Sequence, residues 1–392
     1  MKILFLQWNG IGNEDMTEAF ISLGHEVIKR KFDIHIKRND EEIQEIEVER
    51  WIKDCSCECV FSFNFFPTVS KVCHKIGTPY ISWVYDSPYA NLYHYSLIYP
   101  TNYVFVFDSS VFSEFYSGGI RNVFYLPMAA NTERLRKMND MNSFSKTYLY
   151  NRYPVSFVGS LYDEKHNFFE RMEELSDYTK GFLEGIINAQ KEIYGANFIQ
   201  RILQDNPNIT NEMKEAYDIG NMSDGIASDE YLYAQYFINR RLTAIERKEQ
   251  LSDVAKQFGL DLYTHNKDTQ IEGCVNHGPV DFYDWAPYVF KNSKVNLNIS
   301  LRSIINGIPL RCFDIMGSGG FLLTNFQQDF LNHFNPDEDF VYYESEKDLV
   351  DKIDYYLKNE DERIEIALNG FKKVAAEHTY IHRAAEMLSF IQ

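Results

Sequence analysis

The sequence lacks a long apolar run and lacks an excess of positive charge. No stretch of its 392 residues approaches the ~18 continuous apolar residues of a membrane span, so we expect no integral membrane association. Its 57 acidic residues outnumber 39 basic ones, giving a formal net charge of -18. Because nucleic acids and anionic lipids are themselves negative, we expect neither as a partner. A phosphate-bearing ligand would have to be held by local features.

Cysteine is also scarce, with six residues in the whole chain. Cys55, Cys57 and Cys59 alternate along one run, but a chain this long without an export signal is not expected to use a disulfide framework. A zinc site that recruits Cys73 or His74 is the alternative. The run leads into VFSFNFF with strand periodicity and lacks the usual C-x2-C spacing, so we expect no metal site.

What is present is an alternation of short apolar runs and amphipathic segments, the βαβ pattern of an open parallel sheet. The opening run, MKILFLQWNG, predicts a first strand, because its apolar part is too short for a secretory signal; we therefore expect a cytoplasmic protein. The length of 392 residues favours two domains. We predict a first domain over residues 1–130, a polar linker over 131–152, and a second domain over 153–379 with a helical insertion at about 168–258. Residues 380–392 are predicted to form a C-terminal helix that could pack on the first domain.

Polar residues follow several of the predicted strands in the first half. In parallel sheets ligands gather at the carboxyl ends of strands, where this sequence places Asn64, Asp86, Ser87 and Asp108. The first turn, WNGIGNED, does not match a dinucleotide fingerprint, because Asp15 stands where the third glycine would be. This turn either lines a site for a hydroxyl-rich or cationic group or is plain fold geometry.

The stretch KVNLNISLRSIINGIPLRCFDIMGSGGFLLTN, residues 294–325, has the pattern of an anion site between two buried strands. Pro309 predicts a helix start whose free backbone N–H groups can bind phosphate. Arg311 and Asp314 are spaced i, i+3 on that helix, and Arg302 leaves the preceding strand. A guanidinium matches phosphate oxygens, and a carboxylate suits ribose hydroxyls. The alternative is that Arg311 and Asp314 form an ordinary helix-surface pair.

These motifs resemble those of the CgeB-like (spore-maturation-type) bacterial glycosyltransferases, over nearly the whole chain apart from the predicted insertion. The resemblance rests on LNISLRSIINGIPLRCFDIMGSGGFLLTN, DLVDKIDYYL and AAEHTYIHRAAEML in the second half. In the first half it rests on GNEDMTEAF, YISWVYDSPYANLY, VFVFDSS and YLPMAANTERL. PMAANTERL also resembles the inter-domain signature of glycosyltransferases with two Rossmann-like domains, the GT-B architecture.

The resemblance implies two Rossmann-like domains facing a cleft. A nucleotide-sugar donor, expected to be a UDP-sugar, would bind mainly to the C-terminal domain, and a glycan or protein acceptor would bind mainly to the N-terminal domain. It implies no metal or other cofactor, because helix ends and arginines replace the cation at the diphosphate. The reaction would transfer the sugar to an acceptor hydroxyl.

Site residues follow from the motifs and the resemblance together. The predicted donor-binding residues are Gly159, Ser160, Asn306, Gly307, Ile308, Pro309, Arg311 and Asp314. The predicted acceptor-side residues are Gly12, Asn13, Glu14, Tyr85, Asp86 and Ser87. Arg302 and Arg311 are predicted to stabilise charge on the departing diphosphate, and Asp86 is the first choice of base if configuration inverts.

Two features leave alternatives open. Retaining relatives carry a Glu-x7-Glu pair where this chain has Asn306 and Asp314, so the stereochemistry stays open. Because Asn306 cannot carry the charge of glutamate, a non-catalytic nucleotide- or glycan-binding protein of the same fold is a second hypothesis. A nucleotide-sugar epimerase of the same architecture is a third.

Overall fold

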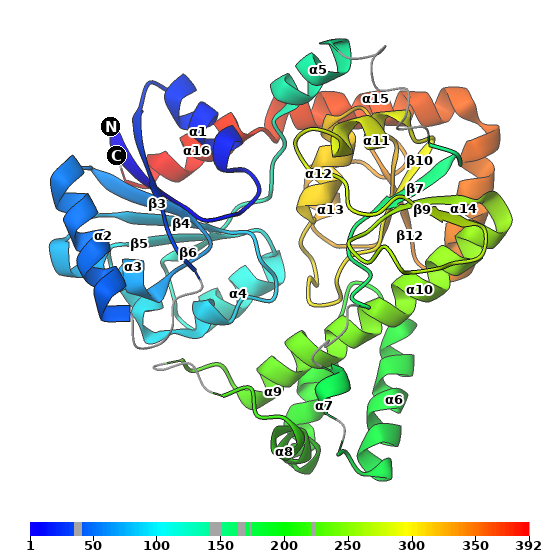
Figure 1. Cartoon of the computed structure of the whole chain (residues 1–392), viewed down its shortest axis with the longest axis horizontal. Coiled ribbons are helices and arrows are strands. Elements are labelled where there is room, and N and C mark those ends of the chain that lie inside the picture. The colour runs from blue at the N-terminus through cyan, green and yellow to red at the C-terminus, as the bar shows by residue number, and fades with distance from the viewer. Residues whose placement is uncertain (35–40, 142–150, 164–168, 173, 221–224, 392) are drawn as a thin grey trace. The chain divides into compact units, whose positions relative to one another are not determined.

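The computed structural model describes residues 1–34, 41–141, 151–163, 169–172, 174–220 and 225–391 (Figure 1). The chain divides into two compact units. Unit 1 comprises Met1–Ala129, Asn221–Ala227 and His378–Gln392, and unit 2 comprises Ala130–Gly220 and Ser228–Glu377. Each unit is built on a six-stranded sheet, which confirms the predicted α/β class with two Rossmann-like domains.

The sheet of unit 1 has the strand order β2-β1-β3-β4-β5-β6, and all paired strands are parallel. Its strands are β1 (Lys2–Gln7), β2 (Glu26–Lys31), β3 (Cys59–Phe63), β4 (Tyr80–Val84), β5 (Asn102–Val106) and β6 (Val123–Tyr125). Its helices are α1 (Asn13–Ser22), α2 (Glu41–Cys55), α3 (Pro67–Ile76), α4 (Ser109–Ser117) and α16 (Tyr380–Ser389), with 3-10 turns η2 (Ala90–Tyr93) and η3 (Tyr95–Ile98). In Figure 1, α1 and α16 cover one face of this sheet, and α2, α3 and α4 cover the other. Strands β3 and β4 are buried along their whole length, as expected for parallel strands covered on both faces.

The C-terminal helix α16 belongs to unit 1. Buried Arg383 donates from Nε to the carbonyl of Pro127 at 2.8 Å and to that of Met128 at 3.3 Å. The hydroxyl of Tyr85 donates to the hydroxyl of Tyr380 at 3.0 Å. These contacts tie the end of the chain to the segment that leaves β6.

The sheet of unit 2 has the order β12-β11-β10-β7-β8-β9 and is also parallel throughout. Its strands are β7 (Val155–Val158), β8 (Leu260–Tyr263), β9 (Cys274–Asn276), β10 (Val295–Asn298), β11 (Leu322–Asn325) and β12 (Val341–Tyr343). The helices around it are α5 (Thr132–Met141), α11 (Ala286–Asn292), α12 (Leu310–Gly317), α13 (Phe330–His333), α14 (Glu346–Lys358) and α15 (Glu360–Glu377).

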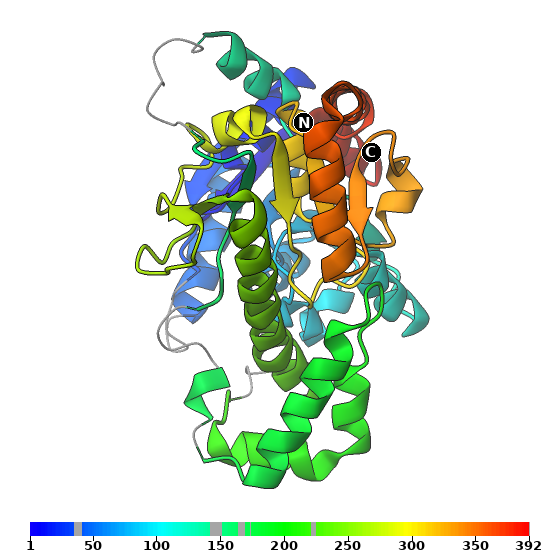
Figure 2. The same cartoon turned by 90° about the vertical axis from the view of Figure 1, so that its right-hand side faces the viewer.

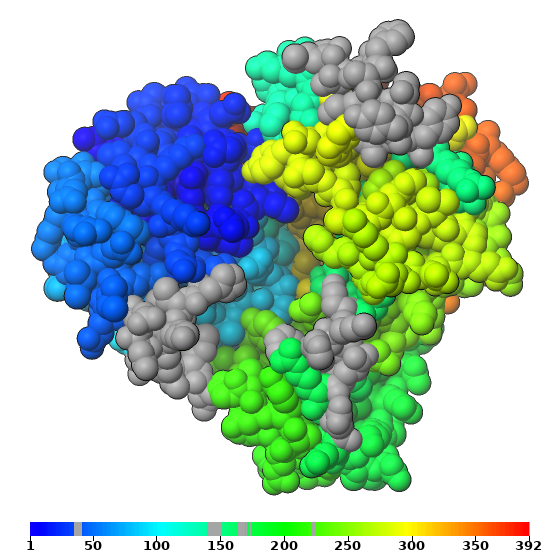
Figure 3. All heavy atoms as spheres, viewed as in Figure 1, coloured from blue at the N-terminus to red at the C-terminus, as the bar shows by residue number. Residues whose placement is uncertain are grey.

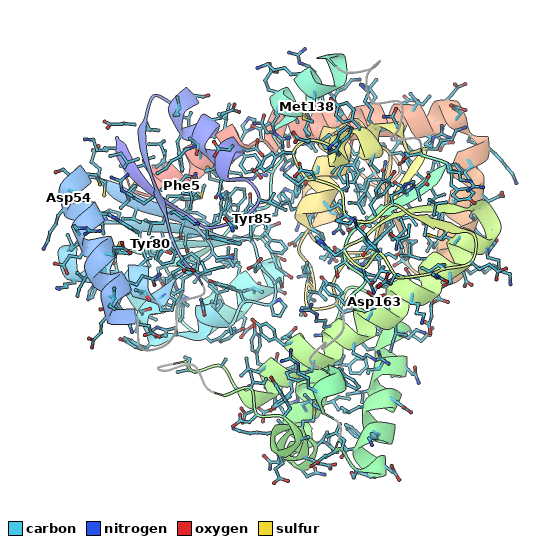
Figure 4. The ribbon with its side chains drawn as sticks, in the orientation of Figure 1. Phe5, Asp54, Tyr80, Tyr85, Met138 and Asp163 are labelled. Carbon is cyan, nitrogen blue, oxygen red and sulfur yellow. The ribbon has the colours of Figure 1, made fainter. Side chains whose placement is uncertain are left out.

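The segment predicted as a linker is folded in its first half. Helix α5 begins after Asn131, whose side chain accepts a hydrogen bond from the N–H of Arg134 at 3.1 Å. Leu135 on this helix is buried, and the hydroxyl of Tyr288 donates to the carbonyl of Met138, labelled in Figure 4, at 2.7 Å. The polar composition of the segment concealed this helix. The rest of the predicted linker, residues 142–150, lies outside the described residues.

The helical insertion in unit 2 confirms that part of the predicted fold. It contains η4 (Phe169–Arg171), α6 (Asp177–Lys191), α7 (Ile199–Asp205), α8 (Pro207–Ala216), α9 (Asp229–Leu232), the π-helical turn η5 (Tyr233–Ile238) and α10 (Asn239–Phe258). It has a hydrophobic core of its own, which includes Leu183, Leu203 and Met213. Figure 2 shows α10 running from beside the sheet of unit 2 into the group of insertion helices, and Figure 3 shows those helices as a green lobe.

The cysteine run differs from its predicted form. Cys55 ends α2 and Cys59 begins β3, so the strand starts only at the last of the three alternating cysteines. All six cysteines are free. Among the described residues no group of three or more His, Cys, Asp or Glu side chains is arranged to hold a metal ion. None of the helices in the described ranges is long and apolar enough to cross a membrane.

Candidate functional site

Asn64 organises the carboxyl edge of the sheet in unit 1. It follows β3 with a φ of 62° and is buried. Its Oδ1 accepts hydrogen bonds from the N–H groups of Tyr85 at 2.9 Å and Asp86 at 3.2 Å. Its Nδ2 donates to Oδ2 of Asp86 at 2.8 Å. The amide of Asn64 therefore fixes both the backbone and the carboxylate of Asp86. Ser87 follows Asp86 in the chain, and Figure 4 labels Tyr85 at this edge of the sheet.

The carboxylate of Asp86 has the features of a proton acceptor. Its side chain is exposed, and Oδ1 makes no hydrogen bond to any residue that the structure describes. Desolvation by the surrounding protein raises the pKa of Asp86, and the hydrogen bond from Asn64 opposes that rise. A carboxylate that is held in a fixed orientation can accept a proton from a hydroxyl when it is ionised.

Gly12 and Asn13 lie at the same edge, in the turn after β1. Gly12 has a φ of 92°, and a Cβ there would lie 2.9 Å from the hydroxyl of Tyr380 and 3.2 Å from that of Tyr85. The position therefore requires glycine for both backbone and space. The side chain of Asn13 donates to the carbonyl of Trp8 at 2.7 Å and so holds the turn closed. These contacts give the turn a role in packing, and its role as part of an acceptor site stays a prediction.

Two other polar candidates of unit 1 have local roles. Glu14 is exposed and forms a surface ion pair with Lys29 at 2.7 Å. Asp108 caps α4, because its Oδ1 accepts from the N–H of Ser110 at 2.8 Å. Neither side chain contacts the Asn64 and Asp86 pair through a hydrogen bond that the structure shows.

In unit 2, the first turn of α12 brings Arg311 to the carboxyl edge of the sheet. The helix begins at Leu310, and Pro309 precedes it in an extended conformation, one position earlier than its predicted place in the first turn. No side chain caps the helix. The N–H of Cys312 donates to the carbonyl of Pro309 at 3.0 Å, and the N–H groups of Leu310 and Arg311 point to where an anion can bind.

The guanidinium of Arg311 lies against the end of β7. Its Nη1 donates to Oδ1 of buried Asn298 at 3.1 Å, and its Cζ lies 5.7 Å from the centre of the Phe157 ring. A Cβ on Gly159 would lie only 2.8 Å from Nη2 of Arg311. Glycine at this position therefore permits a close approach, as the sequence suggested, and the approaching group is an arginine of the protein itself.

Arg311 carries a positive charge that its surroundings only weakly compensate. Burial lowers its pKa, while the nearby charge of Asp314 acts in the opposite direction. Within the described residues Arg311 makes no ion pair, and its only hydrogen bond is the one to Asn298. A partly buried cation without an ion-pair partner is costly unless an anion binds to it.

A second arginine, Arg247 on α10, lies beside Arg311 and was not predicted from the sequence. Its Nε donates to the carbonyl of Ile299 at 3.0 Å, and its Nη1 donates to the carbonyl of Ser160. Its Cζ lies 5.4 Å from the centre of the Phe157 ring. Burial, together with the neighbouring charge of Arg311, lowers the pKa of Arg247 to about 10. We call Gly159, Arg247, Asn298 and Arg311 the arginine cluster.

Arg302 has a structural environment, which argues against its predicted contact with a diphosphate. Its side chain is buried and forms a double ion pair with Glu246 of α10, in which Nε lies 2.7 Å from Oε2. It also donates to the carbonyls of Ile193 at 2.6 Å and Lys191 at 3.2 Å, and its Cζ lies 4.1 Å from the centre of the Tyr194 ring. The guanidinium of Arg302 therefore donates four hydrogen bonds to other residues of the protein. Arg302 does follow the strand, as predicted. Its ion-pair partner, Glu246, comes from α10 of the helical insertion and could not be predicted from the sequence.

The remaining predicted donor residues surround the start of α12. The carbonyl of Asn306 accepts a hydrogen bond from the N–H of Asp329 at 3.0 Å. Gly307 and Ile308 are buried, so Ile308 contributes its side chain to the core and only its backbone to a site. Asp314 is also buried, one turn after Arg311.

Comparison with known proteins gives a family match for part of the chain and a set of similar structures. Residues 244–389 match the family model described as Glycosyl transferase-like. A search of curated proteins finds no match to the chain. Among solved structures, Anabaena Alr3699/HepE in complex with UDP-glucose is similar at 10% identity and a TM-score of 0.54, over 99% of each chain. Sucrose-phosphate synthase from Thermosynechococcus elongatus is similar at 9% identity and a TM-score of 0.54, over 100% of this chain and 98% of that one.

A third similar structure is a glycosyltransferase from Rickettsia africae ESF-5, at 12% identity and a TM-score of 0.52, over 99% of this chain and 97% of that one. At these identities the structural likenesses show the fold, which is the GT-B fold of two Rossmann-like domains. The family match over 244–389 covers the arginine cluster apart from Gly159 and bears out the prediction of a glycosyltransferase.

Proposed function

We propose that this protein transfers a sugar from a UDP-sugar to an acceptor hydroxyl and that Arg311 binds the diphosphate of the donor. The observation that carries the proposal is the guanidinium of Arg311, which makes no ion pair with any described residue and lies at the start of α12, where no side chain caps the helix. Both features attract the same ligand, because helix N-termini and guanidinium groups each bind phosphate oxygens. The complex of the similar Anabaena protein with UDP-glucose supports a uridine nucleotide as the donor.

Sugar transfer is favoured by positive charge close to the leaving diphosphate. As the bond from the sugar to the diphosphate breaks, negative charge grows on the departing phosphate oxygens. Groups that are already oriented toward that charge lower the barrier, because they need not reorganise during the reaction. Asn298 orients Arg311 through one hydrogen bond and leaves its other N–H groups for the ligand. We expect activity without a divalent cation, and turnover that survives EDTA would support this part of the proposal.

Asp86 is our proposed base if the reaction inverts configuration. Its support is the fixed orientation that Asn64 imposes on an exposed carboxylate. Asp86→Asn should abolish transfer while leaving UDP affinity unchanged. Wild-type turnover of this variant would remove Asp86 from the mechanism. The predicted ribose contact of Asp314 stays a prediction, as do the CgeB-like relationship and a glycan or protein acceptor.

A panel of nucleotide sugars tests the proposed function as a whole. The purified protein is incubated with each sugar nucleotide, and released nucleoside diphosphate and isomerised sugar are both measured. Slow release of UDP from one donor, without isomerisation, is the expected result. An isomerised sugar would indicate an epimerase instead, and binding without either product would indicate a non-catalytic protein.

A further inference from the structure

Helix α10 of the insertion buries an unusual row of polar side chains against the sheet of unit 2. Its buried polar residues are Asn239, Thr243, Glu246, Arg247 and Gln250, at positions i, i+4, i+7, i+8 and i+11, which lie on one helical stripe. Such a stripe is ordinarily apolar where a helix packs on a core. Because buried polar groups are stable only with partners, this face must serve particular contacts.

Most of these contacts go to the loop between β10 and α12. The hydroxyl of Thr243 accepts a hydrogen bond from the N–H of Arg302 at 2.9 Å, and Glu246 pairs with the guanidinium of the same residue. Ser303 donates from its hydroxyl to the carbonyl of Gln235, in the π-helical turn before α10, at 3.0 Å. The insertion therefore holds the loop that leads into the first turn of α12.

Arg247 extends this support to a second loop. Its guanidinium donates to the carbonyl of Ile299 after β10 and to the carbonyl of Ser160 after β7. Strands β7 and β10 are neighbours in the sheet, so one side chain joins the ends of both. The planar fork of a guanidinium can reach two acceptors in fixed directions, which an ammonium group cannot do.

The same side chain lies next to Arg311. The Cζ atoms of Arg247 and Arg311 lie 5.4 Å and 5.7 Å from the centre of one ring, that of Phe157. Among the described residues neither arginine makes an ion pair with a carboxylate. Arg247 donates a hydrogen bond to the carbonyl of Ser160, and the guanidinium of Arg311 lies against the backbone of the preceding residue, Gly159.

We propose that Arg247 is a positioning residue of the donor site, through which the helical insertion sets the geometry and charge of the diphosphate subsite. This inference rests on the proposed function. Arg247 holds the carbonyl of Ser160, which follows Gly159, and the guanidinium of Arg311 lies against the backbone of Gly159. The positive charge of Arg247 adds to the electrostatic potential beside the guanidinium of Arg311. The effect is specific for the diphosphate, so the nucleoside part of the ligand should be bound almost unchanged.

Calorimetric titration with UDP and with uridine tests the proposal. We compare wild type, Arg247→Gln, Arg247→Lys and the control Lys248→Gln, which removes the same charge from the adjacent, exposed position of α10. Arg247→Gln should weaken UDP binding by about tenfold, since the charged hydrogen bonds that hold Ile299 and Ser160 and one nearby positive charge are lost, with uridine affinity within about twofold of wild type. Arg247→Lys should recover part of the loss, and the control should bind UDP like wild type.

Three results overturn the proposal in distinguishable ways. Wild-type UDP affinity in a folded Arg247→Gln variant, checked by thermal melting, would remove Arg247 from the donor site. An equal loss of UDP and uridine affinity would show that Arg247 only supports the fold. If Arg247→Gln does not fold, Arg247→Lys is tested instead, and its affinity for UDP is divided by its affinity for uridine. A ratio equal to that of wild type counts against the proposal. Failure of the wild type to bind UDP would overturn the proposed function itself.

Discussion

Replacing Gly159 with alanine tests whether the close approach of Arg311 to this backbone sets donor affinity. The new Cβ would lie 2.8 Å from Nη2 and 3.1 Å from Cζ of Arg311, where ordinary contact begins at 3.4 Å. The guanidinium must therefore withdraw by about 0.6 Å, the difference between the first and last of these distances. The far end of an arginine can move this far at little cost to folding.

The backbone adds a second, smaller effect. Gly159 has a φ of 159°, at the border of the region that other residues rarely adopt, so we expect a strain of about 1 kcal/mol. In a unit of this size such a strain lowers the melting temperature by about 2–4 °C. Displacing a charged donor from its ligand should weaken UDP binding by about tenfold, a larger effect than the change in stability.

The assay is calorimetric titration of UDP, with thermal melting of each variant. Gly185→Ala is the matched control, because Gly185 lies within α6 and a Cβ there would meet nothing within 4 Å. The control should bind UDP like wild type and melt slightly higher, since alanine favours a helix. In an Arg311→Gln background, Gly159→Ala should have almost no further effect on affinity. Full UDP affinity in folded Gly159→Ala would refute the reasoning.

Two further predictions concern Asp86 and Arg302. Asn64→Gly removes the amide whose hydrogen bond lowers the pKa of Asp86, and glycine tolerates the φ of 62° at this position. The pKa of Asp86 should therefore rise, and the acid limb of the pH–rate profile should move to higher pH. If the acid limb does not move, Asp86 is not the titrating base. Arg302→Met should leave Glu246 buried without its partner and cost about 3–5 kcal/mol in urea unfolding, whereas pairing it with Glu246→Leu should recover most of that loss. A single variant as stable as wild type would contradict the structural role of Arg302.

The fold was accessible from the sequence because its signals are local. Buried runs such as those of β3 and β4 alternate with amphipathic helices, and that order alone predicts parallel sheets. Arg311 was accessible for the same reason, since Pro309 and the glycines around it mark a helix start at a strand end. Helix α5 is not predicted, because its sequence is mostly polar and Leu135 is the one buried residue among those of its side chains that the structure describes.

The partners of the charged residues could not be predicted. Arg302 and Arg311 lie close together in the sequence, yet Arg302 forms an ion pair with Glu246, whereas the side-chain hydrogen bond of Arg311 among the described residues goes to the neutral amide of Asn298. The difference depends on α10, which the chain reaches through a separate insertion. The role of Arg247 cannot be predicted for the same reason, because a charged residue in a long helix is ordinarily exposed to solvent.

The most direct test of the account is the UDP affinity of Arg311→Gln compared with that of wild type. The account predicts that wild type binds UDP and that the variant, which melts at no lower temperature than wild type, binds it about 10–100 times more weakly, because a charged group with several N–H donors is lost. Equal affinity of the two proteins for UDP would contradict the assignment of the diphosphate to the arginine cluster.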